Sequence, residues 1–102
     1  MKERRREKLS ALIQEIVSDF FSSELALPSG TLLSISYIEL NDSGTKANVF
    51  TSVYPDEGRD GIANLLKMSE NKATHFLRTR LQSKYSPVIR FRVIENGLVA
   101  KW

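Results

Sequence analysis

The chain has 102 residues, contains no cysteine and carries a formal net charge of +3. A chain of this length is expected to form one domain, residues 1–102, with a hydrophobic core that needs no disulfide or metal. The absence of cysteine excludes a disulfide scaffold and a thiolate metal site. No apolar run approaches the ~18 residues of a membrane helix, and the basic start lacks the apolar segment of a signal peptide, so we expect a cytoplasmic protein.

The charges are distributed unevenly along the chain. Residues 67–92 contain seven of the fifteen Lys and Arg and a single acid, a net charge of +6. Residues 1–8 carry +3, whereas residues 9–66 carry −6. Polyanion binding is the usual physical reason for basic blocks that flank an acidic middle, and a solvated helix face is the alternative that charge alone leaves open.

A first helix is predicted over residues 4–23. Its apolar residues recur at the i, i+3, i+4, i+7 spacing of one buried stripe: Leu9, Leu12, Ile13, Ile16, Val17 and Phe20. The basic residues precede this stripe, in and before the first turn, where the helix dipole disfavours cations. A solvated, frayed end and a partner that contacts these cations both remain open.

Two strands are predicted next, over residues 32–40 and 46–54. Leu33, Ile35 and Tyr37 are expected to share one face of the first strand because side chains alternate along a strand. Asn41 to Gly44 has the composition of a turn, and so short a link predicts an antiparallel hairpin.

A second helical region begins near Asp60. The acids before it are expected to stabilise the helix amino terminus, since the alternating ligands of a calcium loop are missing. The apolar pattern weakens over residues 67–72 and, on one straight helix, Arg80 would fall among the buried positions. Either Arg80 snorkels or the helix bends near residues 70–75, and we favour the bend.

Pro87 is expected to start the last strand, on which Ile89, Phe91 and Val93 share one face. A turn at Asn96-Gly97 and a short apolar end, residues 98–102, follow. The order helix, strand, strand, helix, bend, helix, strand predicts an α+β fold in which helices cover one face of a three-stranded sheet.

Residues that could carry out catalysis are sparse. His75 is the single histidine, no Gly-rich phosphate loop is present, and no Ser or Thr has a fixed spacing to a base. We therefore expect a monomeric binding protein without cofactor or metal, not an enzyme. Nucleic acid fits better than a membrane surface, because the apolar stripe of the first helix is needed for the core. Phe50, Tyr54 and Tyr85 could stack on bases, although packed or merely exposed side chains are the simpler interpretation.

The chain resembles the ribosome-binding factor A family over roughly residues 4–97. The stretch from Ala73 to Thr79 looks like the family's Ala-x-Gly, aromatic, apolar, Arg, Ser segment, with His75 in place of the Gly. Pro87-Val88-Ile89-Arg90-Phe91 looks like its Pro-x-Leu-x-Phe strand. The resemblance implies a type II KH-like fold with an interhelical kink at Ala73, Thr74 and His75. Residues 1–8 would be a basic extension, and the family's longer carboxyl-terminal tail is reduced.

The resemblance also implies a function. The family binds immature small (30S) ribosomal subunits, supports late processing of 16S-type ribosomal RNA, is linked to growth in the cold and leaves with the help of assembly GTPases. Carried onto this sequence, the RNA-binding residues would be Arg4, Arg5, Arg6, Lys8, Lys72, Thr74, His75, Arg78, Arg80 and Lys84. A general single-stranded nucleic-acid-binding KH-like module without a ribosomal role is the alternative, and a protein-interaction domain for an acidic partner is a third possibility.

Overall fold

The structure is a computed structural model that describes residues 2–83 and 85–94. Its elements, in chain order, are α1 (Glu3–Glu24), β1 (Leu32–Leu40), β2 (Lys46–Tyr54), the short 3-10 helix η1 (Asp56–Gly58), α2 (Arg59–Met68), α3 (Glu70–Leu81) and β3 (Val88–Ile94). The predicted order and both hairpin strands are confirmed. The basic residues from Arg4 onward lie within α1, so most of the expected extension is helical. Lys84, the Asn96-Gly97 turn and the end at 98–102 lie outside the described residues.

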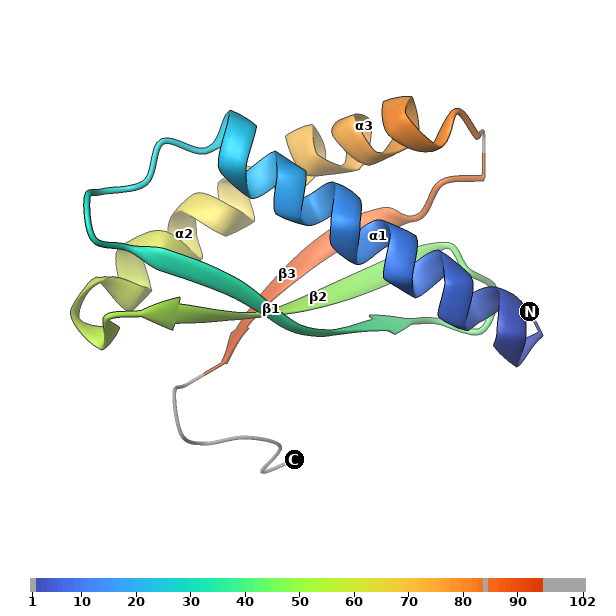
Figure 1. The fold of residues 1–102 in the computed structure, drawn as a ribbon, viewed down its shortest axis with the longest axis horizontal. Coiled ribbons are helices and arrows are strands. Elements are labelled where there is room, and N and C mark those ends of the chain that lie inside the picture. Colours follow the sequence, from blue (N-terminus) through green and yellow to red (C-terminus); the bar gives the residue numbers. More distant parts are fainter. Residues whose placement is uncertain (1, 84, 95–102) are drawn as a thin grey trace.

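The three strands form one sheet in the order β1-β2-β3 (Figure 1). β1 pairs antiparallel with β2 as predicted, and β3 pairs parallel with β2. A parallel pair needs a long crossover, and α2 and α3 supply it. The crossover leaves β2 in the centre and makes β3 an edge strand.

Helix α1 and the consecutive helices α2 and α3 lie on the same side of the sheet, which confirms the predicted architecture (Figure 1). Ile13 and Phe20 of α1 and Leu77 of α3 are fully buried with Val49 of β2 and Ile89 of β3. The buried positions follow the helical period of 3.6 residues in α1 and α3 and the strand period of two residues in β2 and β3, as the sequence pattern predicts. The core therefore lies between the helices and one face of the sheet.

A β-bulge in β1 overturns the expected orientation of Tyr37. Ile35 pairs with Thr51, but Tyr37 already pairs with Phe50, so Ser36 is the extra residue. An inserted residue moves every later side chain to the opposite face. Tyr37 is therefore 39% exposed and stacks on Phe50, with ring centroids 4.4 Å apart and planes 9° from parallel.

The predicted bend exists and lies directly before the range 70–75 predicted for it, but the kink that the resemblance implies at Ala73, Thr74 and His75 is wrong. The break between α2 and α3 falls at Ser69, whereas Ala73, Thr74 and His75 lie inside the continuous helix α3. The Ser69 hydroxyl donates to the Leu65 carbonyl at 2.8 Å, and the Ser69 N–H bonds to the Leu66 carbonyl at 3.0 Å. A serine hydroxyl that competes for backbone groups in this way favours the end of a helix.

Candidate nucleic-acid interface

The amino-terminal end of α1 carries the first group of exposed cations. Lys2, Arg4, Arg5 and Lys8, called here the amino-terminal cluster, line a shallow hollow of about 210 Å³. Among residues 2–83 and 85–94, none of the four forms an ion pair. They lie at the positive end of the helix dipole, so helix and side chains together attract an anion.

Arg6 differs from its neighbours because acids already surround it. One guanidinium nitrogen lies 3.5 Å from the Glu3 carboxylate and the other 3.1 Å from that of Asp42. The second contact ties α1 to the turn between β1 and β2. Of the predicted amino-terminal contacts, Arg6 is thus the one whose charge is offset within the fold.

Two cations of α3 that were predicted to bind RNA form ion pairs with acids of α1. Lys72 Nζ lies 3.7 Å from the Glu24 carboxylate, and Arg80 Nη1 lies 3.2 Å from that of Asp19. The Arg80 guanidinium also lies over the Phe76 ring, 4.5 Å from its centroid. Arg80 is therefore accommodated both by a helix bend and by a cation–π contact at the helix–helix seam.

The opposite side of α3 faces the edge strand β3. The Thr74 hydroxyl accepts the Ile89 N–H at 2.9 Å and donates to the Glu70 carbonyl at 2.8 Å. Glu70 Oε2 accepts the Phe91 N–H at 2.9 Å. Thr74 is 8% exposed and its hydroxyl is engaged on both sides, so the expectation that it contacts RNA does not fit its position.

Arg78 lies four residues after Thr74 and so continues the β3 side of α3, one turn further along. It is exposed, as is His75, and neither has an ion pair with another described residue. Arg78 and His75 thus remain available, whereas Lys72 and Arg80 are partly neutralised. The structure divides the predicted α3 cluster between two sides of the helix.

A second group of cations was not among the predicted site residues. Lys67, Arg90 and Arg92, called here the edge cluster, line a hollow of about 510 Å³ between α2 and β3. Arg90 lies 3.9 Å from the Glu70 carboxylate. All three belong to the +6 stretch of the sequence, but only the sheet order, which makes β3 an edge beside α2, shows that they meet.

The arrangement defines a class of protein, namely a small helix-covered sheet domain with two basic surfaces. Within the described residues, no three His, Asp or Glu side chains gather to hold a metal ion. No described helix is long and apolar enough to cross a membrane. Such basic surfaces can bind an anionic partner.

Comparison with known proteins identifies the family. The model of the family described as ribosome-binding factor A matches residues 5–96. Ribosome-binding factor A of Halothermothrix orenii is 31% identical over 106 aligned residues, covering 95% of this chain and 83% of the relative. The chain therefore belongs to the ribosome-binding factor A family.

The solved structures confirm the fold. The solution structure of a putative ribosome-binding factor A from Thermotoga maritima has a TM-score of 0.73 at 22% identity and covers 100% of this chain and 98% of its own. A Thermus thermophilus ribosome-binding factor A, fitted as a homology model into a cryo-EM map of a 30S complex, has a TM-score of 0.67 at 19% identity, covering 81% and 88%. The expected KH-like α+β fold is thereby confirmed.

Proposed function

We propose that this protein associates with free small ribosomal subunits and assists the late maturation and processing of 16S-type ribosomal RNA, without catalysing a reaction itself. The observation that carries the proposal is the family match over residues 5–96. The Thermus thermophilus relative, which was fitted into a 30S complex, supports the small subunit as the partner.

The charges of the described residues supply the physical basis of this binding. The amino-terminal cluster presents four cations that no described acid neutralises. Cations that meet phosphates release condensed counterions, and this term dominates non-specific affinity for nucleic acids. Arg78 and the edge cluster add cations on the β3 side, where a planar guanidinium can contact a phosphate through two nitrogens.

The proposal also covers location, release and growth conditions. We propose that the protein acts in the cytoplasm as a monomer and that assembly GTPases help to release it from the subunit. Growth in the cold, where RNA misfolding is hardest to reverse, is the condition in which its loss would matter most. A general single-stranded nucleic-acid-binding module would require neither the small subunit nor the assembly GTPases, and no special role in the cold.

Sedimentation of the tagged protein through a sucrose gradient of bacterial lysate tests the proposal. We expect comigration with free small subunits, absence from translating ribosomes, and loss of the peak at high salt. Arg4→Glu should weaken comigration, and the new acid at the start of α1 suits the helix dipole, so the fold is retained. Lys46→Glu is the matched control, since it makes the same charge change on β2 at a residue that belongs to neither cluster.

Two outcomes would contradict the proposal. If the protein stays at the top of the gradient at low salt, the small subunit is not its partner. If it binds free single-stranded RNA as tightly as it binds small subunits, the general nucleic-acid-binding module is the correct function.

A further inference from the structure

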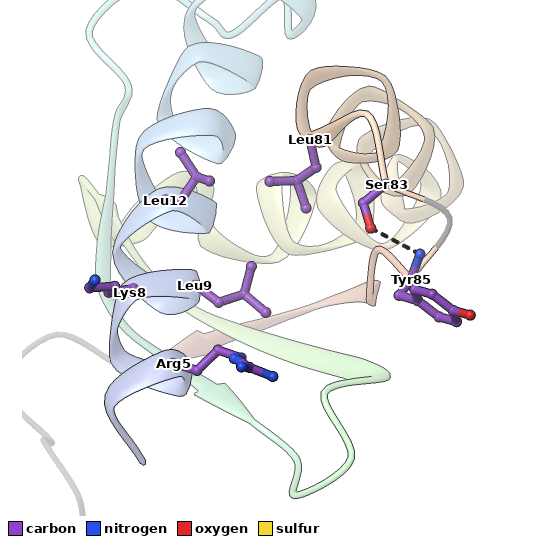
Figure 2. A pocket seen from close by; sticks show the side chains of 7 residues that line it. All are labelled: Arg5, Lys8, Leu9, Leu12, Leu81, Ser83 and Tyr85. Carbon is purple, nitrogen blue, oxygen red and sulfur yellow. Dashed lines mark hydrogen bonds between the residues drawn. The ribbon is translucent and has the colours of Figure 1, made fainter. Parts of the chain in front are cut away.

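An apolar hollow of about 440 Å³ lies between the amino-terminal half of α1 and the end of α3 (Figure 2). Leu9 and Leu12 of α1 and Leu81 of α3 line it, and Ser83 and Tyr85, which follow α3, complete its far side. Its volume falls in the range of about 300–1,000 Å³ that small-molecule pockets occupy. Leu12 is 43% exposed and Tyr85 78% exposed, so the hollow opens to solvent.

The rim of this hollow is cationic. Arg5 and Lys8 border it and also line the adjoining 210 Å³ hollow of the amino-terminal cluster. In Figure 2 the Arg5 side chain extends across the opening below Leu9, whereas the Lys8 ammonium points away from the leucines. An apolar hollow and an anion-attracting hollow therefore share one edge.

A ligand that fits both hollows needs a flat apolar part and an adjacent anionic part. A nucleotide has both, because the base carries a π face and its phosphate carries charge. Leucine side chains and a tyrosine ring can hold a base by contact and stacking, without reading its sequence. The Ser83 hydroxyl accepts the Tyr85 N–H at 3.1 Å and retains its own hydrogen, which can bond to a base edge.

We propose that this hollow holds an unstacked nucleobase of single-stranded RNA, with the adjacent phosphate on Arg5 and Lys8. The inference rests on the proposed function and deepens it, because it states what kind of RNA the protein recognises. Paired RNA keeps its bases stacked inside the helix, whereas a loop or a free end can splay one out. The partner is therefore an unpaired segment, and paired RNA alone would leave the hollow empty.

The test compares two oligomers of equal length and charge in a titration of the isotopically labelled full chain. One is a single-stranded uridine hexamer, and the other is an abasic hexamer with the same backbone. We expect the methyl signals of Leu9, Leu12 and Leu81 to shift with the uridine hexamer but not with the abasic one. Equal shifts with both oligomers, or leucine methyls that do not respond, would overturn the proposal.

Variants separate stacking from charge. Tyr85→Ala should weaken uridine-hexamer binding by about 5- to 150-fold, as base–aromatic stacking energies imply, and leave abasic binding unchanged. Tyr85→Phe should bind like the parent. Tyr54→Ala is the matched control, since Tyr54 is 64% exposed at the end of β2 and should have no effect. Unchanged uridine-hexamer binding by Tyr85→Ala would contradict a base at this ring.

The same preparations distinguish this inference from the proposed function. Comigration with small subunits, together with equal binding of both hexamers, would overturn the base site and leave the proposed function intact. A base-dependent methyl response without comigration would support the site and overturn the ribosomal role. If the leucine methyls respond instead to vesicles of anionic phospholipid and to neither hexamer, the hollow is a lipid site and the proposal fails.

Discussion

The side chain of Thr74 on helix α3 holds the backbone of Ile89 on the edge strand β3, with its hydroxyl oxygen 2.9 Å from the Ile89 nitrogen. One turn earlier, Glu70 holds the N–H of Phe91 in the same way. An edge strand presents unpaired N–H groups that can pair with another chain. Thr74 and Glu70 of α3 thus occupy these N–H groups on the outer edge of β3. The occupied groups cannot pair with a strand of another chain.

Thr74→Val should lower the free energy of unfolding by about 1–3 kcal/mol, because valine has the same shape but leaves the buried Ile89 N–H without an acceptor. Urea denaturation measures the change. Thr79→Val is the control, since the Thr79 hydroxyl bonds to the His75 carbonyl at an exposed site and its loss should cost less than about 0.5 kcal/mol. Equal effects of the two substitutions would contradict the structural role of Thr74.

Phe20→Ala should cost about 3–5 kcal/mol. Phe20 is fully buried, and its ring meets that of Phe76 edge-on, with centroids 5.4 Å apart. Thermal unfolding followed by circular dichroism measures the loss. Leu32→Ala, at a position that is 65% exposed, should change stability by less than about 0.5 kcal/mol. A small effect of Phe20→Ala would mean that the α1–α3 seam is not part of the core.

Gly61→Ala and Gly30→Ala should have opposite effects. Gly61 lies in α2 and an added Cβ would meet nothing within 4 Å, so alanine should stabilise the protein by about 0.4–1 kcal/mol. Gly30 has a φ of +88°, where an L side chain is strained by roughly 1–2 kcal/mol, so alanine there should destabilise. Urea midpoints of the two variants should shift in opposite directions, and a shared direction would contradict these backbone assignments.

Arg78→Glu should weaken small-subunit association without unfolding the protein. Arg78 is exposed and forms no ion pair with another described residue, so the substitution breaks no ion pair within the described fold. If that contact is to a phosphate, the slope of log affinity against log salt should fall by about 1. A pelleting assay at several salt concentrations measures both, and unchanged pelleting would remove Arg78 from the proposed surface.

Arg80→Glu serves as the comparison because its position differs. It would lose the contact to Asp19 and the stacking on Phe76, and it would bring two carboxylates together at the seam. We therefore expect a larger drop in melting temperature for Arg80→Glu than for Arg78→Glu, since both place an acid in the last turn of α3 but only Arg80→Glu also loses the seam contacts. Equal melting temperatures would contradict the seam contact of Arg80.

Much of the fold was predictable because its periodicities are local. The bounds of β1 and β2 follow from alternation and a short polar turn, and the stripe from Leu9 to Phe20 places α1. The single-residue insertion at Ser36 is invisible to such a pattern, because Tyr37 is apolar enough for either face. The bend was predicted from the conflict at Arg80, but its position depends on the Ser69 hydroxyl and on how α2 and α3 pack.

The sequence by itself determined that the chain is basic at two places, forms an α+β domain and contains no cysteine for thiolate chemistry. Only the tertiary structure decided which cations remain available to a partner. Arg80 meets Asp19 across 61 residues and Arg6 meets Asp42 across 36, while Arg4, Arg5 and Arg78 meet no described acid. Local patterns fix which face of an element is polar, but the neutralisation of a charge depends on which distant elements pack beside it, and that is settled only when the core forms.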